Sequence, residues 1–111
     1  LGDFNNAIKY LQDYNASHPV MKVRKWGLLG DAYAELGKKQ EAVEYYTKAA
    51  AAWEEDEVDA PEYLFRAALL NSELGKTKEA IAQLKKIREK YPMHMRYAEA
   101  EKYLGKLGDL N

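Results

Sequence analysis

The stretch WGLLGDAYAELGKKQEAVEYYTKA, residues 26–49, decides the fold. Read at helical spacing, the chain carries two apolar stripes over and just beyond this stretch: Trp26, Leu29, Gly30, Tyr33 and Leu36, and then Ala42, Tyr46, Ala49, Ala50 and Trp53. Gly37 lies between the stripes, so the sequence predicts two amphipathic helices joined by a short turn. Gly30 and Ala42 put almost no side chain on the facing surfaces, which predicts close packing of the two backbones.

A short pattern recurs along the whole chain. Gly2, Gly37, Gly75 and Gly108 each follow a leucine, with separations of 35, 38 and 33 residues. An alanine comes five residues after each of the first three glycines, and Pro19 and Pro92 each come seventeen residues after a glycine. Regular spacing of this kind predicts a helical repeat array.

The sequence resembles the tetratricopeptide repeat family, whose pattern places a Trp, a Leu-Gly pair, a Tyr, an Ala and an aromatic residue at fixed spacing. The matching residues are Trp26, Leu29, Gly30, Tyr33, Gly37, Ala42, Tyr46 and Ala49. Glu54 stands where the family often has a closing proline. The resemblance implies antiparallel helix pairs stacked as a right-handed solenoid.

The predicted fold class is therefore all-α, a right-handed α-solenoid of about six helices in one domain over residues 1–111. A half repeat is expected at 3–17, complete repeats at 22–56 and 60–92, and a second half repeat at 93–108. Asp3 is expected to cap the first helix, and Pro61 to lie in the first turn of a later one. Helices are expected over 20–36, 38–54 and 93–107. Because the chain lacks an initiator Met, we expect it to be part of a longer protein.

Composition limits the classes of function. The 17 basic and 18 acidic side chains give a net charge of −1, which argues against general nucleic-acid binding. No cysteine occurs, so disulfides and cysteine nucleophiles are excluded. The apolar runs are too short to span a membrane, and the start has no signal-peptide pattern. Location stays open between cytoplasm and periplasm.

The residues with catalytic or metal-binding chemistry are few. His18 and His94 lie beside prolines at expected breaks and are interpreted as exposed loop histidines. Met93-His94-Met95 could offer soft ligands to copper, although a single cluster of three does not favour a metal site. We expect no enzyme activity, no cofactor and no metal.

Two further predictions concern polar side chains. Asn71 stands where the family pattern has a tyrosine, and we expect it to hydrogen-bond to a neighbouring helix or line a groove. Among the nine tyrosines, Tyr45 and Tyr63 are predicted to be available for surface contact, whereas the others pack.

In the tetratricopeptide family, the first helices of successive pairs line a concave groove that holds peptides or partner helices. The resemblance implies that this groove is lined here by Arg24, Gly27, Leu28, Asp31, Glu35, Glu62, Phe65, Arg66, Leu69, Glu73, Met95, Glu99 and Lys102. We expect Phe65 and Leu69 to be apolar anchors, with Arg24 and Arg66 selecting for charge. Gly27 and Asp31 replace the lysine and asparagine of the chaperone-binding members, which argues against that partner.

The predicted function is a non-enzymatic scaffold that binds a peptide or helix from a protein partner. The alternative is self-association through uncapped ends, with these apolar residues exposed: Phe4, Ile8 and Leu11 at one end and Tyr97, Leu104 and Leu107 at the other. The arrangement also resembles the C-terminal half of membrane-anchored bacterial proteins such as the ancillary translocon subunit. Those proteins place their repeats outside the cytoplasmic membrane, and this segment itself is not expected to insert into one.

Overall fold

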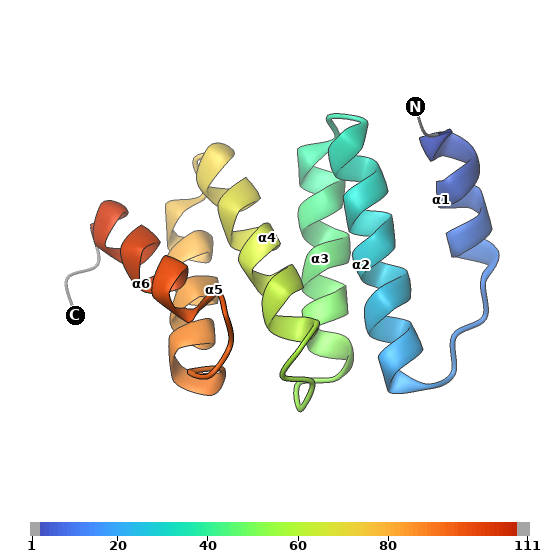
Figure 1. The fold of residues 1–111 in the computed structure, drawn as a ribbon. Coiled ribbons are helices and arrows are strands. Elements are labelled where there is room, and N and C mark those ends of the chain that lie inside the picture. Colours follow the sequence, from blue (N-terminus) through green and yellow to red (C-terminus); the bar gives the residue numbers. More distant parts are fainter. Residues whose placement is uncertain (1–2, 109–111) are drawn as a thin grey trace.

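The computed structural model describes residues 3–108, and these residues form helices joined by turns, with no strand among them. The helices are α1 (Phe4–Asp13), α2 (Pro19–Glu35), α3 (Lys39–Ala52), α4 (Ala60–Glu73), α5 (Thr77–Lys90) and α6 (Tyr97–Lys106). Each helix packs against the next, and α1 and α6 lie at opposite ends of an elongated molecule of 42 × 28 × 21 Å (Figure 1). The predicted all-α solenoid is thus confirmed.

The helices form two layers. In the view of Figure 1, α2, α4 and α6 lie in front of α3 and α5. The turns between the layers use Gly37 and Gly75, whose φ angles of 76° and 78° are in the left-handed region that favours glycine. After each glycine the next backbone N–H bonds back to the helix, from Lys38 to the Tyr33 carbonyl at 2.9 Å and from Lys76 to that of Asn71 at 2.8 Å. Gly2, the first glycine of the pattern, lies outside the described residues.

Most of the predicted boundaries agree with the structure, and two do not. Asp3 caps α1 by accepting from the Asn6 backbone N–H at 3.1 Å, and Pro61 lies in the first turn of α4, both as predicted. However, α1 ends at Asp13 rather than at residue 17, because Tyr14 adopts an extended conformation. The Lys25 ammonium donates to the Tyr14 carbonyl at 2.8 Å and stabilises this end of α1.

The last helix begins four residues later than the predicted start at residue 93. Residues 92–96 form turns, and α6 starts at Tyr97. His94 stabilises these turns, because its Nδ1 accepts from the Arg96 backbone N–H at 3.0 Å and its Nε2 lies 3.0 Å from the Val58 carbonyl oxygen. The bonds of the His94 side chain to Val58 and Arg96 thus hold residues 92–96 in turns, where the sequence had predicted the first turn of a helix.

The acidic loop between α3 and α4, residues 53–59, is ordered by one buried carboxylate. Asp56 is 8% exposed and accepts from the backbone N–H groups of Val58, Asp59 and Ala60 at 2.9–3.1 Å. These bonds satisfy donors at the start of α4, where the N-cap residue Asp59 makes no side-chain cap. The Asp56 carboxylate therefore fixes the loop at the point where α4 begins.

The first repeat, α2 and α3, packs through aromatic rings. A Cβ atom added at Gly30 would lie 2.5 Å from the Tyr46 ring, so the close approach needs glycine, as predicted. Tyr45 stacks between Trp26 and Tyr33, with ring centroids 5.8 and 5.2 Å away. Tyr45 is therefore half-buried, with rings of α2 on its faces, and its predicted availability for surface contact stays a prediction.

The interface between repeats uses a second glycine of α2. A Cβ atom at Gly27 would lie 2.1 Å from the ring of Tyr63 on α4, and that ring also stacks on Tyr46 with centroids 5.9 Å apart. Tyr63 is therefore a packing residue rather than the surface residue we had predicted. The glycine leaves the space that the ring fills.

The second repeat, α4 and α5, packs mainly through aliphatic side chains. Its core comprises Ala50, Leu64, Phe65, Ala68, Leu84, Ile87, Tyr91, Ala100 and Leu104. Asn71 is 3% exposed, and its amide donates to Gln83 Oε1 on α5 at 2.9 Å. The prediction that Asn71 bonds to a neighbouring helix is confirmed.

Candidate functional site

The predicted site residues lie on or beside α2, α4 and α6, but their exposure differs. Those that are exposed are Arg24, Leu28, Glu35, Glu73, Met95, Glu99 and Lys102. Those of intermediate exposure are Asp31, Glu62, Arg66 and Leu69, and those that are buried are Gly27 and Phe65. The structure therefore separates the predicted set into surface, ion-pair and core residues.

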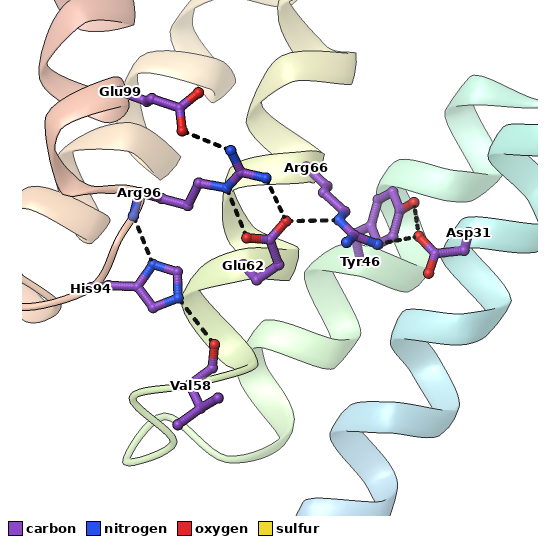
Figure 2. A network of polar contacts seen from close by, with 8 residues as sticks. All are labelled: Asp31, Tyr46, Val58, Glu62, Arg66, His94, Arg96 and Glu99. Atoms are coloured by element: carbon purple, nitrogen blue, oxygen red, sulfur yellow. Dashed lines mark hydrogen bonds and ion pairs between the residues drawn. The ribbon is translucent and has the colours of Figure 1, made fainter.

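Five charged residues form a ladder that crosses the face from α2 to α6 (Figure 2). Arg66 bonds Asp31 at 2.6 Å and Glu62 at 3.0 Å. Arg96 bonds Glu62 at 2.8 Å and Glu99 at 2.7 Å. Figure 2 shows the guanidinium groups alternating with the carboxylates, so each charge has an opposite neighbour.

The ladder reaches the buried layer through Tyr46. The Tyr46 hydroxyl donates to Asp31, and burial together with this carboxylate raises the pKa of Tyr46. Hydrogen bonds from Arg96 and Arg66 lower the pKa of Glu62 below its ordinary value, although partial burial opposes the shift. Burial disfavours the charge on Arg66, yet hydrogen bonds to Asp31 and Glu62 raise its pKa overall. Arg66 is therefore paired with two carboxylates of the ladder while its side chain is 40% exposed, and its role in selecting charge stays a prediction.

Arg96 is the member of the ladder that the sequence analysis missed. It precedes α6, in the segment that we had predicted to be helical. Its partner Glu62 lies 34 residues earlier, and Asp31 lies 35 residues before Arg66. Opposite charges at the repeat spacing were thus a signal present in the sequence.

Phe65 is part of the core, so the prediction that it is an exposed anchor was wrong. It is 2% exposed and meets the ring of Tyr103 edge-on, with centroids 5.9 Å apart. The Arg96 guanidinium covers the ring at 4.8 Å from its centroid. Leu69 is half-buried against the same core. Sequence spacing placed both on the outer face, but the side chains of Arg96 and of Tyr103 on α6 reach this part of α4.

Leu28 remains exposed and borders an apolar groove between α1 and α2. Its exposure is 48%. One hollow of about 300 Å³ is lined by Tyr10, Leu11, Tyr14, Met21, Arg24, Lys25 and Leu28. A second of about 320 Å³ is lined by Phe4, Ala7, Leu11, Leu28, Asp31, Ala32 and Glu35. We call these two hollows, joined at Leu11 and Leu28, the α1–α2 groove.

The ends of the stack are less exposed than the sequence indicated. Ile8 is 8% exposed and packs with Leu29 and Ala32, whereas Leu104 is 2% exposed in the core of the second repeat. Phe4, Leu11, Tyr97 and Leu107 are partly buried. Self-association through the ends stays a prediction, now with a smaller apolar surface to support it.

Both histidines hydrogen-bond to backbone groups close to the start of a helix. His18 Nδ1 accepts from the Val20 backbone N–H at 3.2 Å and caps α2, while both ring nitrogens of His94 bond to backbone groups. Within residues 3–108 no three His, Asp or Glu side chains are grouped so that they could hold a metal ion. In the same part of the chain, no helix has the length and apolar character to cross a membrane.

The stacking of successive helix pairs, each packed against the next, defines a helical-repeat solenoid protein. Comparison with known families is specific: two tetratricopeptide repeat models match, one at residues 24–52 and the other at residues 62–92, which together exceed half of the chain. The chain belongs to the tetratricopeptide repeat family. No curated protein matches it. Repeats of this family generally mediate protein–protein interaction and scaffolding, and proteins built from them are typically not enzymes.

Proposed function

We propose that this chain is a non-enzymatic interaction module that binds a segment of a protein partner along the face of α2, α4 and α6, with its apolar contact in the α1–α2 groove. The observation that carries the proposal is the exposure of Leu28 beside Leu11, between two hollows of about 300 and 320 Å³. Exposed apolar side chains gathered along a hollow are typical of a binding surface.

A comparison with the next repeat supports an open groove. Leu28 and Arg66 hold equivalent positions, each two residues after the residue at the tryptophan position of the family pattern, Trp26 or Leu64. Arg66 reaches back to Asp31 on the preceding front helix, at 2.6 Å. Among the described residues, no helix precedes α2 in the layer formed by α2, α4 and α6. At the position of the Arg66 guanidinium, α2 instead carries the apolar side chain of Leu28. We therefore expect the partner to place an apolar side chain against Leu28.

The rim of the groove carries charges that differ between its two ends. Arg24 and Lys25 line the hollow at the start of α2, and Asp31 and Glu35 line the hollow near its end. The α2 dipole has the same polarity, positive at the start and negative at the end. We expect a bound helix to carry acidic residues near Arg24 and basic residues near Glu35, because this orientation pairs opposite charges.

The test is a selection from a peptide library displayed on phage, with the 111-residue chain as bait. Selected peptides are then titrated by fluorescence anisotropy against the wild type, Leu28→Asp and Leu74→Asp. Leu74 is a matched control, since it is 38% exposed at the end of α4 and lies off the groove. We expect Leu28→Asp to weaken binding at least about tenfold, because it removes the apolar contact with the peptide and buries a carboxylate in its place. Leu74→Asp should stay within about twofold of the wild type.

Circular dichroism should show that both variants keep the helical fold, which is the control for this test. Equal affinity of the selected peptides for Leu28→Asp and the wild type would overturn the proposed groove. Failure of the selection to return any peptide that binds the wild type would overturn the proposed function.

A further inference from the structure

The three most exposed large apolar side chains in the described chain lie in two loops that contact each other through His94. Val58 is 71% exposed in the loop 53–59, and Met93 and Met95 are 90% and 82% exposed in the segment 91–96. His94 joins the loops, because its ring lies between the Val58 carbonyl and the Arg96 backbone N–H (Figure 2). We call Val58, Met93 and Met95 the loop patch.

Hydrogen bonds to the backbone hold the loop patch in place. Asp56 accepts from the Val58 backbone N–H at 2.9 Å, while His94 bonds the carbonyl of the same residue at 3.0 Å. Both polar groups of the Val58 backbone are therefore satisfied, and its side chain is left outside (Figure 2). Met93 and Met95 flank the fixed histidine. Ordered loops that expose apolar side chains present a surface at low cost in conformational entropy.

A hollow of about 340 Å³ adjoins the patch at Val58. Its lining comprises Val20, Arg24, Trp53, Glu55, Asp56, Glu57, Val58 and Asp59. Asp56 is committed to the three backbone N–H groups, and Asp59 lies 3.5 Å from Arg24. Glu55 and Glu57 are exposed, so their carboxylates add negative charge beside the ring of Trp53. An indole ring with adjacent carboxylates suits a lysine or arginine side chain.

We propose that the loop patch and its acidic hollow dock a basic amphipathic segment of a protein partner. A cation of that segment enters the hollow beside Trp53 and Glu57, and apolar side chains one helical turn away lie on Met93 and Met95. Methionine suits this contact because its flexible thioether adapts to different apolar shapes. The negative charge of the hollow favours a basic partner and repels nucleic acid or an anionic membrane.

The loop patch is separate from the proposed groove, whereas its acidic hollow adjoins the groove at Arg24, which lines both. The groove lies between α1 and α2, whereas the patch lies in the loops that precede α4 and α6. The inference also accounts for Met93-His94-Met95 without a metal, because both ring nitrogens of His94 are already bonded and only the two thioethers are presented. The triplet thus supplies an apolar contact surface.

The test uses a fluorescein-labelled helical peptide of leucine and lysine, about 14 residues long, and a matched peptide of leucine and glutamate. Anisotropy titrations in low salt compare the wild-type chain with Met93→Gln/Met95→Gln and with Glu55→Gln/Glu57→Gln. We expect the lysine peptide to bind and the glutamate peptide not to bind. Each double variant should weaken binding about fivefold or more, and the glutamine variant of the acids should also reduce the salt dependence.

Two controls separate the site from its alternatives. Glu41→Gln/Glu44→Gln removes two exposed acids of α3 away from the loops, and Leu28→Gln changes the proposed groove, so both should stay within about twofold of the wild type. No binding of the lysine peptide would overturn the proposal, as would wild-type affinity of the Met93→Gln/Met95→Gln variant. An equal loss in Glu41→Gln/Glu44→Gln would indicate diffuse charge attraction and would also overturn it. A loss in Leu28→Gln alone would assign the peptide to the groove instead.

Discussion

The two complete repeats fill the same packing positions with different side chains. Where α2 has Gly30 and α3 has Tyr46, the second repeat has Ala68 on α4 and Leu84 on α5. The first pair combines glycine, which has no side chain, with the large ring of Tyr46. The second pair combines the methyl group of Ala68 with the branched side chain of Leu84. Both pairs are buried. The family geometry therefore constrains the sum of the two volumes more than either residue alone.

The repeats also differ in how deeply their apolar side chains are buried. In the first repeat, the rings of Trp26, Tyr33 and Tyr45 stack on one another and stay partly exposed. In the second, Leu84 and Ile87 are 1% and 0% exposed. Both repeats have a helix on each side, α1 and α4 for the first and α3 and α6 for the second. The fully buried aliphatic core of the second repeat should therefore contribute more to stability than the partly exposed ring stack of the first.

The largest expected effect comes from emptying the core of the second repeat. Leu84→Ala should lower the free energy of unfolding by about 3 kcal/mol, because it removes buried methyl groups and leaves a cavity among closely packed neighbours. Urea denaturation followed by circular dichroism measures the loss. Leu74→Ala is the control, at 38% exposure, and should cost under about 1 kcal/mol. Similar losses for both variants would contradict the contrast in burial.

An intermediate effect should follow from giving the first repeat the residues of the second. Gly30→Ala should cost about 2 kcal/mol, because its Cβ would lie 2.5 Å from the buried Tyr46 ring. Tyr46→Leu should also destabilise, since it removes the ring and the donor to Asp31. The double variant should lose less than the sum of the two, by about 1 kcal/mol.

Denaturation of the four members of this double-mutant cycle supplies the measurement. Strict additivity would show that Gly30 and Tyr46 do not share one volume, and the comparison between the repeats would then fail.

The smallest effect concerns the ladder that links the repeats. Glu62→Gln should cost roughly 1 kcal/mol near neutral pH, because the Arg partners are only partly buried. The folded state lowers the pKa of Glu62, mainly through hydrogen bonds from Arg96. Its contribution to stability is therefore present above the unfolded pKa, about 4.3, and is lost as the pH falls through the lowered folded value.

Thermal melts between about pH 6 and pH 3 measure this dependence. The wild type should lose more stability over that interval than Glu62→Gln does. Parallel pH profiles for the two proteins would show that Glu62 gains nothing from the ladder.

The sequence predicted the helices from local chemistry. Apolar spacing fixed which face of each segment turns inward, and the Leu-Gly pattern located the turns at Gly37 and Gly75. Asp3 and Pro61 marked helix starts through short-range hydrogen bonding and backbone geometry. Each of these signals acts within about one or two helical turns, so it can be read without knowledge of the neighbours.

The candidate site was only partly predictable. The predicted groove residues do lie on or beside the front helices, but their accessibility depends on residues about one repeat away. Phe65 is covered by Arg96 and Tyr103, and Arg66 is engaged by Asp31. Helical spacing gives the direction of a side chain but not what the next repeat places over it.

The sequence by itself determined the repeat class, the helix order and the glycine that the first repeat needs at position 30, because these depend on spacing and size along one chain segment. Only the tertiary structure decided which surface stays open. Phe65 is buried because Tyr103 and Arg96 cover it. Leu28 is exposed because no described helix covers the α1–α2 groove. The turns before α6 likewise depended on His94 reaching Val58, a contact across 36 residues that no local pattern specifies.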